Sequence, residues 1–182
     1  MATIGLRDVY YAILKSDPVG GTPTYDSPVR IAGAISANVN PNASAATLFA
    51  DDGPYDTAAT IGEISLELNM ADLDLETQST LLGHTVQGGV LKKKAGDVPP
   101  WVAVGFRTLK SNGKYRYYWL NKGKFALPEE DLQTKGDSIE FTTPTISGSF
   151  VKRNSDDEWE RVGDEDQSGF EASSWFNSPL QE

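Results

Sequence analysis

Hydrophobic and polar residues alternate along much of this chain, and the dominant period is two. In the segment ISLELNM at 64–70, the residues Ile64, Leu66, Leu68 and Met70 fall on one face and polar residues on the other. This alternation is typical of a strand with one buried face. Residues 29–35 alternate in the same way. Both segments are predicted to be strands.

The clearest hairpin lies between residues 101 and 125. A nearly continuous apolar run at 101–109 is followed by Ser-Asn-Gly-Lys at 111–114. The Asn-Gly dipeptide favours the positive φ angles of a tight turn between antiparallel strands. The second strand should carry aromatic residues on one side and cations on the other. The aromatic side is Tyr115, Tyr117, Trp119 and Phe125, and the cationic side is Lys114, Arg116, Lys122 and Lys124.

Two further strands are expected towards the end of the chain. One begins at Ile139 and Phe141 and continues through Ile146 and Phe150, and its alternation shifts at Pro144. Because proline cannot donate to a sheet ladder, a bulge or a sheet edge is expected at that point. Residues 154–157 should then turn the chain back through a strand that contains Trp159 and Val162.

One segment, at about 72–82, is predicted to be a helix. Asp72 or Asp74 can cap its N-terminus, Leu75 and Leu82 should share a face, and Gly83 suits the C-terminal end. A second short helix is expected at 169–176.

The segment 38–60 has no regular hydrophobic period and is predicted to be a long loop. It is rich in Ala, Asn, Asp, Gly and Thr, yet it contains Leu48, Phe49 and Tyr55. A long unstructured insertion in a compact domain usually has a function. The strands together predict a mainly β fold with one flanking helix, in a single domain over 1–182.

Charge is distributed in blocks. Residues 31–91 contain eight acids and no Lys or Arg, whereas residues 92–127 contain nine bases and one acid. The C-terminal segment 154–182 is acidic again, with nine acids and one arginine. Such blocks suggest that a basic element meets acidic ones, within one subunit or between subunits.

Residues typical of catalytic and metal sites are scarce. The chain has no cysteine, and its one histidine, His84, follows the predicted helix end, where a structural role is favoured over a catalytic one. The acids at 72–76 lack the spacing of a calcium loop, and Asp51-Asp52-Gly53 is predicted to be a turn rather than a calcium site. No phosphate-binding glycine motif, signal peptide or membrane-spanning run is recognised. An enzyme, a cofactor and a metal site are therefore not expected.

A binding module is an alternative interpretation. Proteins that bind single-stranded nucleic acid combine aromatic side chains with cations, and Tyr118 and the cationic strand could serve such a module or a carbohydrate-binding one. In the predicted hairpin, however, the aromatic residues and most cations lie on opposite faces. This arrangement favours a core role for the aromatics and leaves the cationic face free to meet an acidic surface.

A series of short segments, none of them a catalytic signature, extends over nearly the whole chain. They are IGL at 4–6, AGAI at 32–35, ADDGP at 50–54, LLGH at 81–84, PWVAVGFR at 100–107, NGKYRY at 112–117, WL at 119–120, KGKF at 122–125, TKGD at 134–137, FTTPTI at 141–146, Trp159 and WF at 175–176. In the order and number of these segments the chain resembles the major tail proteins of long-tailed bacteriophages, specifically the phi13-type group.

The resemblance implies a structural virion protein. Its fold would be a β-sandwich or barrel-like pair of sheets, and its copies would form rings, expected to be hexameric, that stack into the hollow tube of a siphovirus tail. Its partners would be identical copies, the tape measure and the terminator, with DNA passing through the lumen without specific binding. Assembly would take place in the host cytoplasm without membrane insertion. A tail terminator, a connector or a secretion-tube component is the alternative within the structural class.

The subunit interface can be predicted from the residues that such a role would use. The loop at 38–60 is a candidate arm reaching a neighbouring ring, and the cationic hairpin face is expected to meet an acidic block of an adjacent copy. The candidate interface residues are Leu48, Phe49, Tyr55, Lys114, Arg116, Lys122, Lys124, Trp175 and Phe176.

Overall fold

A computed structural model describes residues 2–128 and 143–180 and confirms the mainly β fold with one flanking helix. In these ranges nine strands form one antiparallel sheet, and two short strands form a separate hairpin. The large sheet has the order β2-β1-β8-β9-β10-β5-β4, with β11 also paired to β9 and β3 to β1. Its strands are β1 (Thr3–Ser16), β2 (Thr24–Tyr25), β3 (Val29–Ile31), β4 (Ala34–Ala50), β5 (Gly53–Met70), β8 (Val102–Lys110), β9 (Tyr115–Phe125), β10 (Thr145–Phe150) and β11 (Glu160–Asp164).

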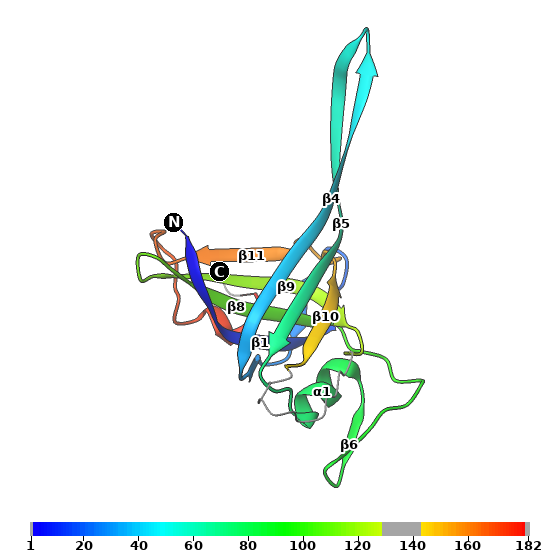
Figure 1. Cartoon of the computed structure of the whole chain (residues 1–182), viewed down its shortest axis with the longest axis vertical. Helices are drawn as coiled ribbons and strands as arrows, with labels where there is room; N and C mark the ends of the chain where they lie inside the picture. Colours follow the sequence, from blue (N-terminus) through cyan, green and yellow to red (C-terminus); the bar gives the residue numbers. More distant parts are fainter. Residues whose placement is uncertain (1, 129–142, 181–182) are drawn as a thin grey trace, which may run out of the picture.

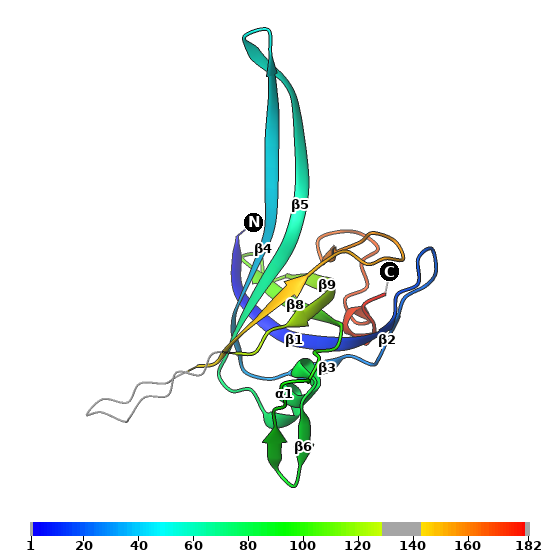
Figure 2. The same cartoon turned by 90° about the vertical axis from the view of Figure 1, so that its right-hand side faces the viewer.

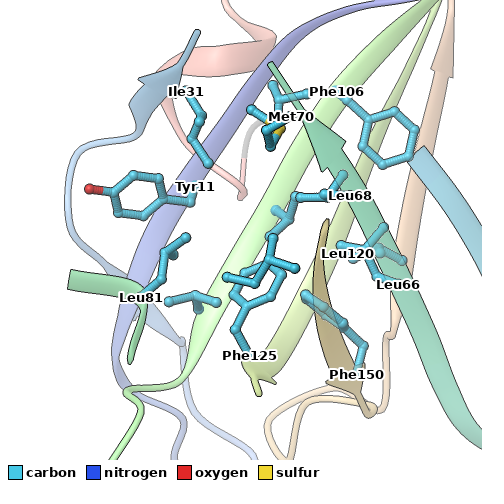
Figure 3. Close-up of a cluster of buried hydrophobic side chains, with 14 of the residues drawn as sticks. Tyr11, Ile31, Leu66, Leu68, Met70, Leu81, Phe106, Leu120, Phe125 and Phe150 are labelled. Carbon is cyan, nitrogen blue, oxygen red and sulfur yellow. The ribbon is translucent and has the colours of Figure 1, made fainter. Parts of the chain in front are cut away.

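The main core lies between the two halves of this sheet. Figure 3 shows side chains of β1, β8 and β9, such as Tyr11 and Leu120, meeting Leu66 and Leu68 of β5 and Phe150 of β10. Among the described residues no ladder joins β4 back to the other end of the sheet, so the sheet does not close into a barrel. The predicted pair of sheets is thus one open sheet whose halves share a core, with the β6–β7 hairpin beside it.

The predicted hairpin at 101–125 is present as β8 and β9. Gly113 has a φ of 83°, as the Asn-Gly turn requires, and the Lys110 amide donates to the Lys114 carbonyl oxygen at 2.8 Å. Val104 pairs with Leu120 but Val102 pairs with Gly123, so β9 contains one extra residue. This bulge shifts the alternation, and Phe125 packs in the main core, away from the face that contains Tyr117 and Trp119. The prediction that Phe125 shares their face was therefore wrong.

The prediction of a long loop at 38–60 was wrong. These residues form most of a long hairpin in which β4 and β5 pair from Ala34 and Met70 to Ala50 and Gly53. Its outer part has almost no buried side chain, so no hydrophobic alternation marks it, and the pairing rests on backbone hydrogen bonds. Figures 1 and 2 show this hairpin projecting far beyond the rest of the molecule.

The prediction of one strand at 29–35 was also wrong, because Gly33 interrupts it. Gly33 has a φ of 80°, and its carbonyl oxygen accepts a hydrogen bond of 2.7 Å from the Ala71 amide. The residues before it form β3, which pairs with β1, and those after it begin β4. The strand at 64–70 is confirmed as the end of β5, with Leu66 and Leu68 fully buried.

The predicted helix is confirmed as α1 (Leu75–Leu82). The Asp74 side chain accepts a hydrogen bond of 2.5 Å from the Thr77 amide, and Gly83 ends the helix in the left-handed conformation. Leu82 is buried, but Leu75 is exposed, so these two leucines do not share a buried face. The chain then forms a hairpin of β6 (Thr85–Gln87) and β7 (Val90–Lys92), which the sequence pattern did not indicate.

The last predicted elements are partly confirmed. Residues 154–157 form the expected turn, closed by a 2.9 Å hydrogen bond from the Arg153 amide to the Glu158 carbonyl oxygen, and β11 follows. The strand through Ile146 and Phe150 is β10, whereas Ile139 and Phe141 lie outside the described residues. The helix predicted at 169–176 was wrong, because this region contains only the short 3-10 turn η1 (Trp175–Asn177).

Candidate assembly surfaces

The outer end of the β4–β5 hairpin is the first candidate surface. Asp51 and Asp52 occupy its two-residue turn with φ angles of 51° and 60°, the pair of positive values that matches the twist of a tight hairpin. The turn predicted at Asp51-Asp52-Gly53 is thereby confirmed. Short polar side chains such as aspartate tolerate this left-handed conformation better than bulky ones do.

The hairpin tip combines apolar and acidic side chains, and it is defined here as residues 48–56. Phe49 and Tyr55 are 71% and 73% exposed, and Leu48 is also largely exposed. Asp51, Asp52 and Asp56 lie among them, and the tip contains no cation. Large exposed apolar side chains that gather at one place typically mark an interaction surface.

Unpaired strand edges are the second candidate surface. β10 pairs with β5 only from Ile64 to Asn69, so the part of β5 from Gly53 to Glu63 pairs with β4 alone within the described residues. The outer edge of β4 has no strand partner in the same ranges. Exposed edges of this length can add a further strand from another chain.

The cationic face of the β8–β9 hairpin meets the acidic C-terminal block of the same chain. The ammonium of Lys110, buried beside β9, contacts the carboxylates of Asp164 and Asp166. Arg116 pairs with Asp164 at 2.9 Å and Lys114 with Asp166 at 3.1 Å. The hydrogen bond from Lys110 is the main reason that the pKa of Asp164 falls to about 2. The charge blocks thus neutralise one another inside the subunit at this place.

Lys122 likewise has its partner inside the chain. Its side chain is 8% exposed, and its ammonium lies 2.7 Å from the Asp17 carboxylate. Burial opposes ionisation of Asp17, but hydrogen bonds from the Asn154 amide, Lys122 and Ser155 outweigh it and lower the pKa of Asp17 to about 2. The ion pair links the loop after β1 to β9, and the hydrogen bonds from the Asn154 and Ser155 amides link the same loop to the turn after β10.

Lys124 is the remaining cation of the predicted face, and it lies over an aromatic ring. Its ammonium is 4.7 Å from the centre of the Trp101 ring, a cation–π contact. Among the described residues no carboxylate lies within ion-pair distance of Lys124. Of the four predicted cations, it alone has no acidic partner in that part of the chain.

Trp175 and Phe176 pack against the subunit's own aromatic face. The Trp119 indole donates a hydrogen bond of 3.0 Å to the Trp175 carbonyl oxygen, and the ring of Phe176 stacks on Tyr10 with centres 4.4 Å apart. Together with Tyr117 they form a second apolar cluster. The predicted interface role of these two residues stays a prediction, although most of their contact surface is used inside the subunit.

His84 and Tyr118 both have structural surroundings. His84 is buried, and its Nδ1 lies 2.7 Å from Asp97, which also accepts a hydrogen bond from the Lys94 amide. These contacts hold together the two ends of the segment 84–97, which contains β6 and β7. Tyr118, which a binding module could use, is half-buried and stacks on Phe106 with ring centres 5.0 Å apart.

The residues that the structure describes contain no cluster of three or more His, Asp or Glu side chains suited to hold a metal ion. No helix within residues 2–128 and 143–180 is long and apolar enough to cross a membrane.

Unpaired strand edges and an exposed apolar projection are typical of a structural protein that assembles. A family model described as phage tail tube protein matches residues 1–178. The chain therefore belongs to the phage tail tube protein family, which confirms the resemblance found in its sequence. It is a non-enzymatic component of a virion and assembles with copies of itself and with other tail components.

The other comparisons add little to this assignment. A chain of the cryo-EM structure of the anti-feeding prophage (AFP) baseplate, 6-fold symmetrised, is similar at 13% identity with a TM-score of 0.47. The alignment covers 90% of the present chain and 96% of that chain. A TM-score this low supports no conclusion about how the present chain assembles. No curated protein was found to match the sequence.

Proposed function

We propose that this protein is the major tail protein of a siphovirus and that its copies form stacked hexameric rings. The rings build a hollow tube through which the genome is delivered, and the tape measure and the terminator are the other tail partners. The whole chain, 1–182, acts as one tail-tube domain. The observation that carries this proposal is the long β4–β5 hairpin, which leaves strand edges unpaired and carries an exposed apolar tip.

Ring formation follows from the unpaired edges. A strand edge that pairs with the next copy around a closed ring leaves no edge to aggregate. Stacking of rings requires a second, head-to-tail contact, and the projecting hairpin is long enough to reach a neighbouring ring. Among the candidate interface residues, Leu48, Phe49 and Tyr55 would provide the apolar part of that contact. Lys114, Arg116 and Lys124 are the predicted cations that remain partly accessible for contacts between subunits.

Passage of DNA sets an electrostatic condition. DNA in transit must not adhere to the wall, so the bore should be neutral or acidic. Each copy contributes a formal charge of −10, and the pairing of Lys110, Lys114 and Arg116 with carboxylates in the same chain neutralises a basic surface that could bind phosphates. The bore is therefore expected to release DNA rather than bind it.

Electron microscopy of the concentrated protein tests the proposal. Negative staining should reveal long tubes of uniform width, with six subunits per ring in class averages. Single rings that never elongate would indicate a terminator or a connector instead. A persistent monomer that binds oligonucleotides or glycans would favour the binding-module alternative.

A further inference from the structure

A groove lies at the root of the projecting outer part of the β4–β5 hairpin, about midway along β5. Its volume is about 680 Å³, which is enough to hold several side chains. Its apolar lining comes from Ile61 and Ile64 of β5, Trp101, Val151 and Trp159. Ile61 is 54% exposed although it faces this apolar surface. The groove thus leaves apolar surface of Ile61 and Trp101 open to solvent, whereas Ile64 in the same lining is buried.

Four charged side chains line the groove, and two of them pair with each other. Lys152 pairs with Asp157, and Glu63 accepts a hydrogen bond from Ser149. Lys124, over the Trp101 ring, is the cation in the lining that has no carboxylate partner among the described residues. An occupant of this groove should therefore be largely apolar and should bring a carboxylate to Lys124.

We propose that this groove receives the hairpin tip of a second copy of the chain. The tip offers the three apolar side chains Leu48, Phe49 and Tyr55 together with Asp51, Asp52 and Asp56, and it contains no cation. Apolar side chains would fill the groove, and one of the aspartates would pair with Lys124. Most of the affinity would come from the apolar contact, since a partly exposed ion pair contributes only about 0–1 kcal/mol.

The position of tip and groove on one hairpin fixes the geometry of the contact. Ile61 and Ile64 lie nine and twelve residues after Asp52 along β5. At about 3.3 Å per residue, the distance from tip to groove is therefore roughly 30–40 Å. A copy displaced by that distance along the hairpin would present its groove to the tip of the first copy. Because the two surfaces differ, repeating the displacement gives an open head-to-tail stack rather than a closed dimer. This inference rests on the proposed tube function and adds the site that receives the hairpin.

Disulfide trapping tests the contact directly, because the natural chain contains no cysteine. The double variant Phe49→Cys/Ile61→Cys places one thiol on the tip and one in the groove. Within a chain Phe49 pairs with Pro54, seven residues before Ile61, so the two positions lie roughly 23 Å apart at about 3.3 Å per residue. This is far beyond the roughly 7 Å that a disulfide tolerates between Cα atoms. After mild oxidation, a non-reducing gel should show a ladder of dimers, trimers and longer species, and each single variant should stop at the dimer.

A matched variant tests the rival contact at the other end of the molecule. Figure 1 shows the hairpin tip and the β6–β7 hairpin at opposite ends of the long axis, and Val90 in β7 is exposed next to three lysines, Lys92 to Lys94. If tips meet that end, Phe49→Cys/Val90→Cys gives the ladder and Phe49→Cys/Ile61→Cys does not. That result would overturn the proposal. A Phe49→Cys/Ile61→Cys variant that gives dimers and no longer species would also overturn it, because such a product indicates reciprocal pairing of two copies. Should Ile61→Cys fail to fold, Val151→Cys offers a thiol in the same groove.

Microscopy of the same samples separates this inference from the proposed function. Tubes that form without a Phe49→Cys/Ile61→Cys ladder refute the groove contact and leave the tube function standing, whereas the absence of rings and tubes from the natural protein refutes the function.

As a second readout, Ile61→Asp should raise the protein concentration needed for tube growth at least about tenfold, because it places a charge in the apolar contact. The control Val19→Asp, in the exposed loop after β1, should change that concentration less than about twofold.

Discussion

At the scale of single residues, close contacts between glycine and aromatic rings determine how tightly the core packs. Gly123 lies at the bulge of β9, directly against the ring of Phe150. A Cβ atom at this position would lie 2.4 Å from a ring carbon, and at Gly105 it would lie 2.8 Å from the Trp119 indole. The aromatic rings therefore occupy the space that a side chain would need, and the sheet depends on glycine at these places.

Gly123→Ala should lower the free energy of unfolding by about 1–3 kcal/mol, because the added methyl group forces Phe150 out of its position in a closely packed core. Urea denaturation followed by tryptophan fluorescence measures the change. Gly96→Ala is the matched control, since a Cβ atom there has no neighbour within 4 Å, and it should change stability by less than about 0.5 kcal/mol. Equal effects of the two substitutions would contradict this account.

The pair of Asp17 and Lys122 makes stability depend on pH. The folded-state pKa of Asp17, about 2, lies below the usual value of 3.8, so the pair stabilises the protein fully above about pH 4 and loses that effect as the pH falls towards 2. Asp17→Asn should lower the free energy of unfolding at pH 7 by roughly 1–2 kcal/mol, a range that allows for screening by solvent. It should also make the free energy of unfolding depend less on pH between pH 4 and 2.

Urea titrations at several pH values between 2 and 7 provide the measurement. The control Asp26→Asn removes a carboxylate from an exposed pair with Lys15 and should have little effect at any pH. If the free energy of unfolding of Asp17→Asn falls between pH 4 and 2 as steeply as that of the natural protein, other carboxyl groups cause this pH dependence.

At the scale of elements, the outer part of the β4–β5 hairpin contributes little to the fold of one subunit. From Asn42 to Gly62 its side chains make almost no buried contacts, whereas the inner part, with Leu66 and Leu68, belongs to the core. Stability and assembly therefore depend on different parts of the same two strands.

Replacing residues 44–60 by Asn-Gly, between the paired residues Ala43 and Ile61, should leave the melting temperature within a few degrees of the natural value. The removed side chains are exposed, so little buried surface is lost. The same variant should form no tubes in electron micrographs. Normal tubes from this shortened chain would contradict a role of the hairpin in stacking, and a large fall in melting temperature would indicate that the hairpin is part of the folding unit.

At the scale of the whole molecule, the length of the hairpin limits the spacing of the rings. If each tip lies in the groove of the next copy, the axial repeat cannot exceed the separation of tip and groove, roughly 40 Å at about 3.3 Å per residue over twelve residues. A hairpin inclined to the tube axis would give a smaller value. The layer-line spacing in electron micrographs of tubes measures the repeat directly, and a clearly longer repeat would exclude the groove contact.

Much of the fold could be predicted where burial imposes a pattern. The strand at 64–70 and the hairpin around Asn112-Gly113 follow from alternation and turn chemistry, and Asp74 and Gly83 mark the ends of α1. The outer hairpin could not be predicted, because with both faces exposed nothing in its side chains distinguishes a strand from a loop. Its one local signal is the Asp-Asp-Gly turn at the tip.

The sequence by itself determined the mainly β class, the helix, the lack of cysteine and the charge blocks, because these depend on residue type and local spacing. Only the tertiary structure decided which charges meet. It placed Lys110, Lys114 and Arg116 against Asp164 and Asp166 of the same chain, and Lys122 against Asp17. It also placed a partly exposed apolar groove at the root of the projecting part of the hairpin whose tip is apolar and acidic. Contacts between residues far apart in the chain depend on how the strands pair and bend, which no local pattern encodes.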